Sequence, residues 1–442
     1  MKRWLVVLLV LLALVILVSP GIIGRLAEQN MEESIEWAES ESPGVSITTE
    51  TYNRGWFTSE GQHRVVLQGG QFREAAEKYA EATGNTELPS LVIDTRLDHG
   101  LLPVTSLSRD AGSLAPGLAS TISTFQLDPG NGDLVELPGT LYSSVSLAGA
   151  NDARLILETG SFEFEEVMVN WEGADLAIYS DRNTGETTVH GAIEPWGMTS
   201  DDGEMSIGTI RIDADQVRTD YGFSTGLAEI DIGTITVKDD GQQFVLGGMA
   251  IKMDSGIEDG RVNSTGTVSV NDVAVPGFGD VALVMETSIN RFHAESLGAV
   301  VKALRDAQAS DDPQMALQMI FPEIEDDLIT LVSSGAELRF DQLSITLPQG
   351  TIETKIAVDI AEMDAGADFA WPSVLLAMTA SVDLRFPAAL YDMAAMMNPQ
   401  AGQLVAMGVL QKDGDEYVMA AEYAQGLVNV NGVPMPVPIP GL

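Results

Sequence analysis

One segment has the spacing of a catalytic motif. Gly222-Phe223-Ser224-Thr225-Gly226 fits the Gly-x-Ser-x-Gly pattern of serine hydrolases, in which the nucleophile sits on a tight turn between a strand and a helix. Residues 210–217 before it alternate as a strand, but residues 227–237 alternate as well and show no helical period. The pattern therefore predicts a β-hairpin. A hydrolase centred on Ser224, with His293 as the only later histidine, stays as the weakest alternative.

The other residues that could do chemistry form no recognisable site. The chain has no cysteine, which excludes disulfides, thiol nucleophiles and cysteine-based metal centres. It has four histidines: His63, His99, His190 and His293. They form no zinc motif, and we expect each at a surface or turn position. The acidic turn that begins at Asp128 lacks EF-hand spacing, and no P-loop is present. We predict no catalytic residue, no metal and no cofactor.

The charge balance is strongly acidic. The chain has 65 Asp and Glu against 23 Lys and Arg, which gives a formal net charge of −42. A field of this sign repels phosphate backbones and anionic headgroups. We therefore expect no nucleic acid partner and no lipid binding through a basic patch. The same acidity is typical of proteins from saline habitats, and that alternative stays open.

Residues 1–24 predict a membrane anchor. Lys2 and Arg3 precede an uncharged apolar run, and the apolar character continues through Ile23. As a helix, residues 4–23 would be about 30 Å long, which matches the hydrocarbon core of one bilayer. The side chains expected in lipid include Trp4, Leu5, Leu8, Leu12, Val15 and Ile16.

The flanks of this run predict its topology. The positive charges at its start place the N-terminus in the cytoplasm and export the rest of the chain. The run is longer than the apolar part of a signal peptide, and no Ala-x-Ala cleavage pattern follows it. We therefore predict an uncleaved signal-anchor and a single-pass protein.

The rest of the chain predicts an α+β fold dominated by antiparallel strands. Short alternating runs between Gly- and Asp-rich turns recur up to about residue 290. Such short connections permit antiparallel pairing only, because parallel strands need long crossovers. The predicted organisation is an anchor at 1–24, an amphipathic helix or stalk at 25–42, a β-rich region at 43–290 and an α+β region at 291–442.

Several helices interrupt the strands. The sequence predicts them at Gln71–Thr83, Ala294–Ala309, Pro313–Ser334 with a break at Pro322, Ala388–Met397 and Gln400–Leu410. The last two are rich in methionine: Met393, Met396, Met397 and Met407. We expect these side chains in a core, although an adaptable apolar surface for lipid or a partner is the alternative. The sequence Ile-Gly-Thr-Ile at the start of Ile207–Ile212 occurs again at the start of Ile232–Val237, which fits a repeated pair of strands.

A longer pattern spans the chain. Its most specific pieces are Tyr52–Ser59 and the closing Asn431-Gly432, and its residues are Tyr52, Arg54, Gly55, Trp56, Phe57, Ser59, Asn431 and Gly432. Together with the N-terminal anchor, they resemble the YdgA-like family of bacterial proteins, whose function is unknown. The resemblance implies an inner-membrane anchor and a periplasmic body, leaves a homodimer open, and assigns no active site.

The residues of the first piece also have a physical interpretation. Arg54-Gly55 suits a close backbone approach. We expect Trp56 and Phe57 on opposite faces of a strand, with one packed inward. The other would lie against the amphipathic helix or at the membrane interface, where tryptophan is favoured.

Three functions follow from these observations. The first is a non-enzymatic scaffold or interaction protein of the cell envelope, which requires nothing further. The second is a lipid-binding or lipid-handling protein, which requires a continuous apolar groove that the protein's own side chains leave unfilled. The third is the hydrolase at Ser224. A filled core would count against the second.

Overall fold

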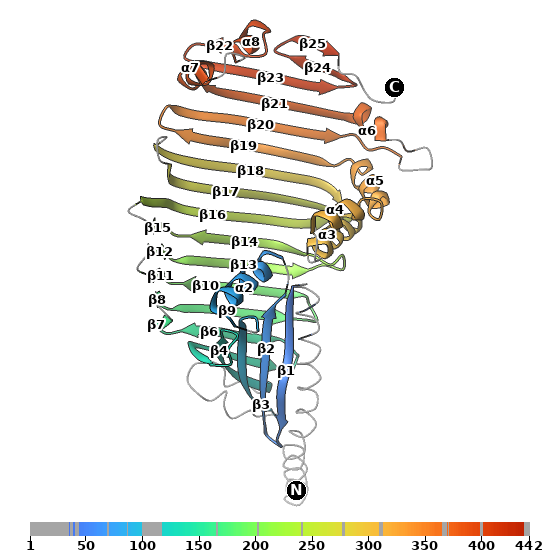
Figure 1. The fold of residues 1–442 in the computed structure, drawn as a ribbon. Coiled ribbons are helices and arrows are strands. Elements are labelled where there is room, and N and C mark those ends of the chain that lie inside the picture. The colour runs from blue at the N-terminus through green and yellow to red at the C-terminus, as the bar shows by residue number, and fades with distance from the viewer. Residues whose placement is uncertain are drawn as a thin grey trace, which may run out of the picture. The chain divides into compact units, whose positions relative to one another are not determined.

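The protein is described by a computed structural model. It describes residues 44–68, 70–85, 87–99, 117–164, 167–200, 203–239, 242–275, 279–308, 313–364, 371–397 and 401–436, together with Ile35, Glu39 and Phe369. Antiparallel strands joined by short connections dominate these residues, and a few helices flank them (Figure 1). The predicted predominance of antiparallel β structure is confirmed.

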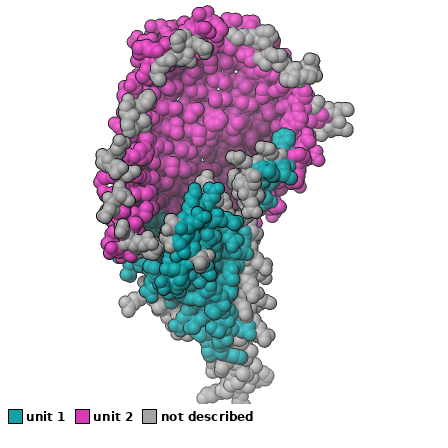
Figure 2. All heavy atoms as spheres, viewed as in Figure 1, with its two compact units in different colours: residues 1–160, 172–193, 303–321 teal, residues 161–171, 194–302, 322–442 magenta. Residues whose placement is uncertain are grey.

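The chain forms two compact units. Unit 1 contains residues 1–160, 172–193 and 303–321, and unit 2 contains residues 161–171, 194–302 and 322–442 (Figure 2). The alternating strand pattern stops near residue 290 because a helix begins there, and the sheet itself continues. The strand before it pairs with the strand that follows at Glu337–Leu347.

Unit 1 is built on one antiparallel sheet. Its strands, in spatial order, are β1 (Val45–Arg54), β2 (Thr58–Leu67), β3 (Ser90–His99), β4 (Gly117–Asp128), β5 (Val135–Ser146), β6 (Asn151–Leu157), β9 (Ala174–Asp181) and β10 (Glu186–Ile193). Helix α2 (Gly70–Thr83) connects β2 to β3 and ends at Gly84, whose φ of 71° stops the helix. Helix α4 (Pro313–Ile320) also belongs to this unit.

Unit 2 is built on a longer antiparallel sheet. Its main strands, in spatial order, are β8 (Val167–Trp171), β11 (Trp196–Thr199), β12 (Gly203–Ile207), β15 (Ile235–Asp239), β16 (Gln242–Glu258), β17 (Arg261–Val275), β18 (Gly279–His293), β19 (Glu337–Leu347), β20 (Gly350–Ile360), β21 (Met378–Pro387), β23 (Glu416–Ala424), β24 (Leu427–Val430) and β25 (Val433–Pro436). Proline in β25 fits a strand at the edge of the sheet.

Shorter strands complete this sheet. The hairpin of β13 (Ile210–Arg218) and β14 (Ser224–Ile232) pairs with β16 beside β15, and β22 (Gln411–Asp413) pairs with β23. Strand β7 (Gly160–Phe164) lies where unit 1 gives way to unit 2 along the chain.

Most of the remaining helices match the sequence periodicity. They are α3 (Ala294–Gln308), α5 (Glu325–Ser333), α6 (Trp371–Ala377), α7 (Ala388–Met397) and α8 (Ala401–Ala406). Helix α6 was not predicted, and α8 ends four residues before the predicted Leu410. The predicted break at Pro322 is confirmed, because α4 ends at Ile320 and α5 begins at Glu325.

The repeated phrase marks two bends that face each other. Gly208 lies between β12 and β13, and Gly233 lies between β14 and β15. Each glycine N–H donates to the turn opposite, from Gly208 to the carbonyl of Thr234 and from Gly233 to that of Thr209, both at 2.8 Å. A Cβ on either glycine would lie about 3.0 Å from the facing backbone. The repeat therefore reflects a close crossing of two bent strands.

Candidate functional site

One face of the unit 2 sheet carries two unbroken rows of apolar side chains. The registers of β13, β14, β16, β17, β18 and β19 align one row of Ile212, Ile230, Ile251, Val268, Met285 and Leu343. The same registers align a second row of Ile210, Ile232, Met249, Val270, Leu283 and Ile345. We call these two rows the apolar face. They share a face because successive side chains of a strand point to opposite sides.

The protein leaves the apolar face incompletely covered. Every residue in its two rows is half-buried and none is fully buried, and Met253, which continues one side of it along β16, is 52% exposed. The fully buried apolar side chains of unit 2 lie elsewhere, at or near helices and strand ends, and include Val262, Ala294, Ile324, Leu331, Val374 and Leu390. The sheet therefore does not use this face as an ordinary core.

The opposite face of the same strands is polar and acidic. Between the apolar positions of β13 lie Arg211, Asp213 and Asp215, all exposed. Cross-strand ion pairs engage several of the cations, as in Lys252–Glu229 at 3.4 Å. Such exposed pairs stabilise a protein by only about 0–1 kcal/mol. The sheet is thus amphipathic, with carboxylates on one side and hydrocarbon on the other.

Two helices contact tyrosines at opposite ends of β23. At one end the Tyr391 ring of α7 lies 4.1 Å from that of Tyr417, measured between centroids. At the other end the Tyr423 hydroxyl donates to the Leu375 carbonyl of α6 at 2.8 Å. Figure 2 shows that unit 2 is hollowed on the side facing the viewer.

The methionines near these helices are only partly inside. Met393 is half-buried, but Met396 and Met407 are 80% and 57% exposed. The expected core position is therefore wrong for Met396 and Met407. The side chain of Met397 lies outside the described part of the structure.

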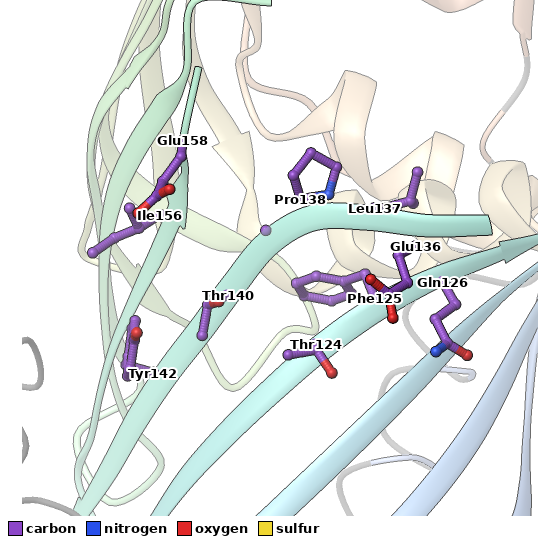
Figure 3. Close-up of a pocket in the computed structure, with 11 residues that line it drawn as sticks. Thr124, Phe125, Gln126, Glu136, Leu137, Pro138, Thr140, Tyr142, Ile156 and Glu158 are labelled. Carbon is purple, nitrogen blue, oxygen red and sulfur yellow. The ribbon is translucent and has the colours of Figure 1, made fainter. Parts of the chain in front are cut away.

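Unit 1 contains a separate polar pocket of about 550 Å³. Figure 3 shows Gln126 and Glu136 on one side of Thr140, and Ile156 and Glu158 on the other. Gly139 also lines it, and an added Cβ there would make an ordinary van der Waals contact with the Phe125 ring at 3.5 Å. Its lining mixes polar and apolar side chains in similar amounts and indicates no ligand class.

Two histidines are buried in unit 1, contrary to expectation. Ser59 Oγ lies 3.1 Å from His99 Nε2, and both residues are almost fully buried. His63 Nδ1 lies 3.0 Å from the Thr49 hydroxyl, and burial lowers the pKa of His63. Short polar side chains solvate these rings inside the sheet, which the sequence did not reveal. Asp98 alternates to the face opposite His99, so no Ser-His-Asp arrangement forms.

The loop after β4 is held by one aspartate. Asp128 Oδ1 accepts hydrogen bonds from the N–H groups of Gly130 and Gly132, and Asp128 Oδ2 accepts one from Arg64 at 2.7 Å. Burial raises the pKa of this carboxyl, but these hydrogen bonds outweigh burial and hold the pKa below its ordinary value. Asp128 therefore closes the loop, and no group of three or more potential metal ligands gathers in the described residues.

The first family piece forms the β1–β2 turn. Its Tyr52 is half-buried and its Arg54 exposed. Trp56 and Phe57 precede β2 instead of belonging to it, and they are 55% and 54% exposed. The strand position and the inward packing predicted for one of them are wrong. Gly55 is required sterically, because an added Cβ would lie 2.6 Å from the Thr58 carbonyl oxygen.

The second family piece, Asn431-Gly432, links the turn after β24 to β23 and to the segment after α8 by hydrogen bonds. Asn431 has a φ of 50°, and Gly432 a φ of 85°. The Asn431 side chain accepts a hydrogen bond from the Ala420 N–H at 2.8 Å and donates to the carbonyls of Gly408 and Val409, both at 2.9 Å. Both pieces therefore have a structural explanation.

The Gly-x-Ser-x-Gly segment is a hairpin turn. Ser224 opens β14 and is exposed, and the chain continues as a strand to Ile232. His293 ends β18, with its Nδ1 3.1 Å from the Ser296 hydroxyl. The strand-to-helix turn that a nucleophile elbow needs is missing at Ser224.

The predicted anchor residues lie outside the described part of the chain. These are Trp4, Leu5, Leu8, Leu12, Val15 and Ile16. Within the part that is described, none of the helices has both the length and the apolarity to span a bilayer.

Comparison with known proteins identifies the family. A family model described as "Bacterial protein of unknown function (DUF945)" matches residues 1–438. The chain belongs to the DUF945 family. No curated protein and no solved structure matches it. Within this DUF945 protein, the open apolar face of unit 2 is therefore the feature on which a functional argument can rest.

Proposed function

We propose that this DUF945 protein binds the acyl chains of lipids along the apolar face of unit 2. The observation that carries the proposal is the incomplete burial of that face: two rows of Ile, Val, Leu and Met side chains cross the sheet and none of them is fully buried. Monomeric soluble proteins rarely expose contiguous apolar patches of more than a few hundred Å². An acyl chain that covers such a face gains about 0.8 kcal/mol for each buried CH₂ group.

The hollow of unit 2 supports this use of the face. Side chains on the concave side of a curved sheet converge and shelter one another, while those on the convex side spread into solvent. Ile212 is half-buried, whereas its neighbours Arg211 and Asp213 are exposed. We infer that the apolar face lines the hollow seen in Figure 2.

The charge of the protein selects the headgroup. A net charge of −42 disfavours anionic lipids near the sheet, whereas a zwitterionic or neutral headgroup meets no such repulsion. The lipid class that fits is therefore a zwitterionic phospholipid.

The location is part of the same proposal. Residues 4–23 would hold the protein in the bacterial inner membrane, with the N-terminus in the cytoplasm and the body in the periplasm. This is the arrangement implied by the resemblance to YdgA-like proteins. The role is non-enzymatic: the protein carries or shelters a lipid.

A pair of adjacent positions on β16 tests the proposal. Met253 extends the apolar face and Asp254 lies on the acidic face, and both are exposed. Because the chain has no cysteine, Met253→Cys and Asp254→Cys each give one site for an environment-sensitive nitrobenzoxadiazole (NBD) label. The labelled full chains are reconstituted into phosphatidylcholine vesicles.

The expected result is a blue shift at position 253 together with quenching by phosphatidylcholine that carries a spin label in its acyl chain. Position 254 should report water in both measurements. Equal behaviour of the two labels would overturn the proposal, because a bound chain can cover only one face.

A further inference from the structure

The β1–β2 turn presents two large aromatic side chains on a fixed support. Trp56 and Phe57 are both more than half exposed. The turn is closed by a hydrogen bond from the Gly55 N–H to the Thr58 carbonyl at 2.8 Å, and the His99 N–H donates to the Phe57 carbonyl at 2.9 Å. The exposure is therefore built into the backbone, and no side-chain rearrangement is needed to present the rings.

The charge at this turn differs from that of the whole chain. Residues 51–59 contain one cation, Arg54, and no carboxylate, although the chain has 65 acidic residues against 23 basic ones. Tryptophan, phenylalanine and arginine suit the boundary between water and hydrocarbon, because each has an apolar body or stem that can enter the headgroup layer. An acidic turn at the same place would be repelled by lipid phosphates.

The start of the described chain bears on where this turn lies. Glu39 is helical, and its carboxylate accepts a hydrogen bond from the Ile47 N–H at 2.7 Å, so the predicted helix lies beside β1 at this point. The helix predicted at residues 25–40 would rise about 24 Å from the anchor. Strand β1 has 10 residues and is about 33 Å long. Run back beside the helix, it would carry the β1–β2 turn about 9 Å past residue 25, to the depth at which the predicted anchor enters the bilayer.

We propose that the Trp56-Phe57 turn is seated in the headgroup region of the membrane that holds the anchor. The turn then acts as a second contact with the bilayer and fixes the height and orientation of the unit 1 sheet above it. This inference rests on the proposed anchor, and it does not depend on lipid binding by unit 2.

Single labels at the two ends of the unit 1 strands test the proposal. Phe57→Cys places an NBD label in the β1–β2 turn, and Leu134→Cys places one in the β4–β5 connection. Leu134 is a matched control, because it is also a large exposed side chain, at 44%, and the strand registers put it at the opposite end of the strands in the same sheet. Both full chains are reconstituted into phosphatidylcholine vesicles, and flotation confirms that they are held by the anchor.

The expected result is a blue-shifted emission at position 57, with stronger quenching by lipids spin-labelled near the headgroup than by lipids labelled near the chain end. Position 134 should report water. Adding Trp56→Ser to the Phe57→Cys chain should reduce the quenching, since the remaining aromatic contact is lost.

Two outcomes would overturn the proposal, and they are distinguishable. Chains that fail to float show that the anchor is wrong, and the second contact falls with it. Chains that float but give an unquenched label at position 57 refute the second contact alone. The second outcome leaves the test at Met253 unchanged, so a failure of the second contact is separate from a failure of lipid binding by unit 2.

Discussion

A single charge in the apolar face should expel a bound acyl chain. Ile251 is central in this face, with Ile230 and Val268 directly opposite it on the two neighbouring strands. The substitution Ile251→Glu places a carboxylate where we propose that hydrocarbon lies. The substitution Ser269→Glu adds the same charge on the other face of the next strand, because Ser269 follows Val268 along β17.

The magnitude follows from the spacing of the strands. Neighbouring strands are about 4.8 Å apart, so an extended chain that crosses the sheet lays about four CH₂ groups over each strand. If those groups leave the surface around the introduced carboxylate, the loss is about 3.2 kcal/mol at about 0.8 kcal/mol for each CH₂. This corresponds to about a 200-fold weaker affinity, since about 1.4 kcal/mol is a factor of ten. The fold itself should lose less, because the face is already open to solvent.

Photo-crosslinking measures this loss in the membrane-bound protein. Full chains are reconstituted with a small fraction of phosphatidylcholine that carries a diazirine in its acyl chain. After irradiation, mass spectrometry quantifies the labelled fraction of peptides from β13 to β18, and labelling of residues 4–23 serves as the internal reference. Below saturation the labelled fraction follows the affinity. Labelling of unit 2 should fall to background in Ile251→Glu and stay at the wild-type level in Ser269→Glu.

Two results would refute the reasoning. Equal labelling of unit 2 in the two variants would show that the chain does not lie on the apolar face. A large loss of thermal stability in Ile251→Glu alone would show that the face is buried in the folded protein, which contradicts the exposure on which the proposal depends.

Three further predictions concern the framework. Asn431→Ala should lower the free energy of unfolding by about 2–4 kcal/mol in urea, because three side-chain hydrogen bonds are lost, while Asn429→Ala should have little effect. Asp128→Asn should be less stable than the wild type at pH 7. Folding lowers the pKa of Asp128, so its carboxylate contributes fully to the free energy of unfolding above the unfolded pKa near 3.8, and this contribution is lost as the pH falls through the folded pKa. Urea unfolding should therefore show a smaller stability difference between the wild type and Asp128→Asn at pH 3 than at pH 7. Gly208→Val should destabilise the bend between β12 and β13, whereas Gly256→Val, where an added Cβ meets nothing within 4 Å, should be tolerated in a thermal melt.

The sequence predicts local structure well where turn-forming residues or a helical period mark it. Gln425-Gly426 lies between two alternating runs, and it forms the two-residue turn between β23 and β24 with both residues at positive φ, 52° and 79°, as such a turn requires. The range predicted for α7 is also confirmed, and that for α3 differs by one residue at its end. Both signals depend only on residues that are close in sequence.

The sequence does not predict which surfaces the fold covers. Alternation places Ile251 on one face of β16, but alternation is the same whether that face meets a second layer or solvent. The burial of His63 and His99 depends on Thr49 and Ser59, which the fold brings beside them from elsewhere in the chain. Only pairing between distant segments decides these environments.

The family residues show the same limit. Asn431-Gly432 signals a turn, and the turn is observed. The partners of the Asn431 side chain, at Gly408 and Val409, lie more than twenty residues away and carry no pattern of their own. Trp56 and Phe57 fit a strand by composition, but the hydrogen bond that closes the turn at Gly55 ends the strand before them.

Native mass spectrometry of the full chain, released from membranes and kept free of detergent, tests the central claim most directly. The account predicts a mass increment that matches a zwitterionic phospholipid, present in the wild type and in Ser269→Glu and missing in Ile251→Glu. A protein that carries no lipid, or a lipid retained equally by all three chains, would contradict the claim that the apolar face of unit 2 holds an acyl chain.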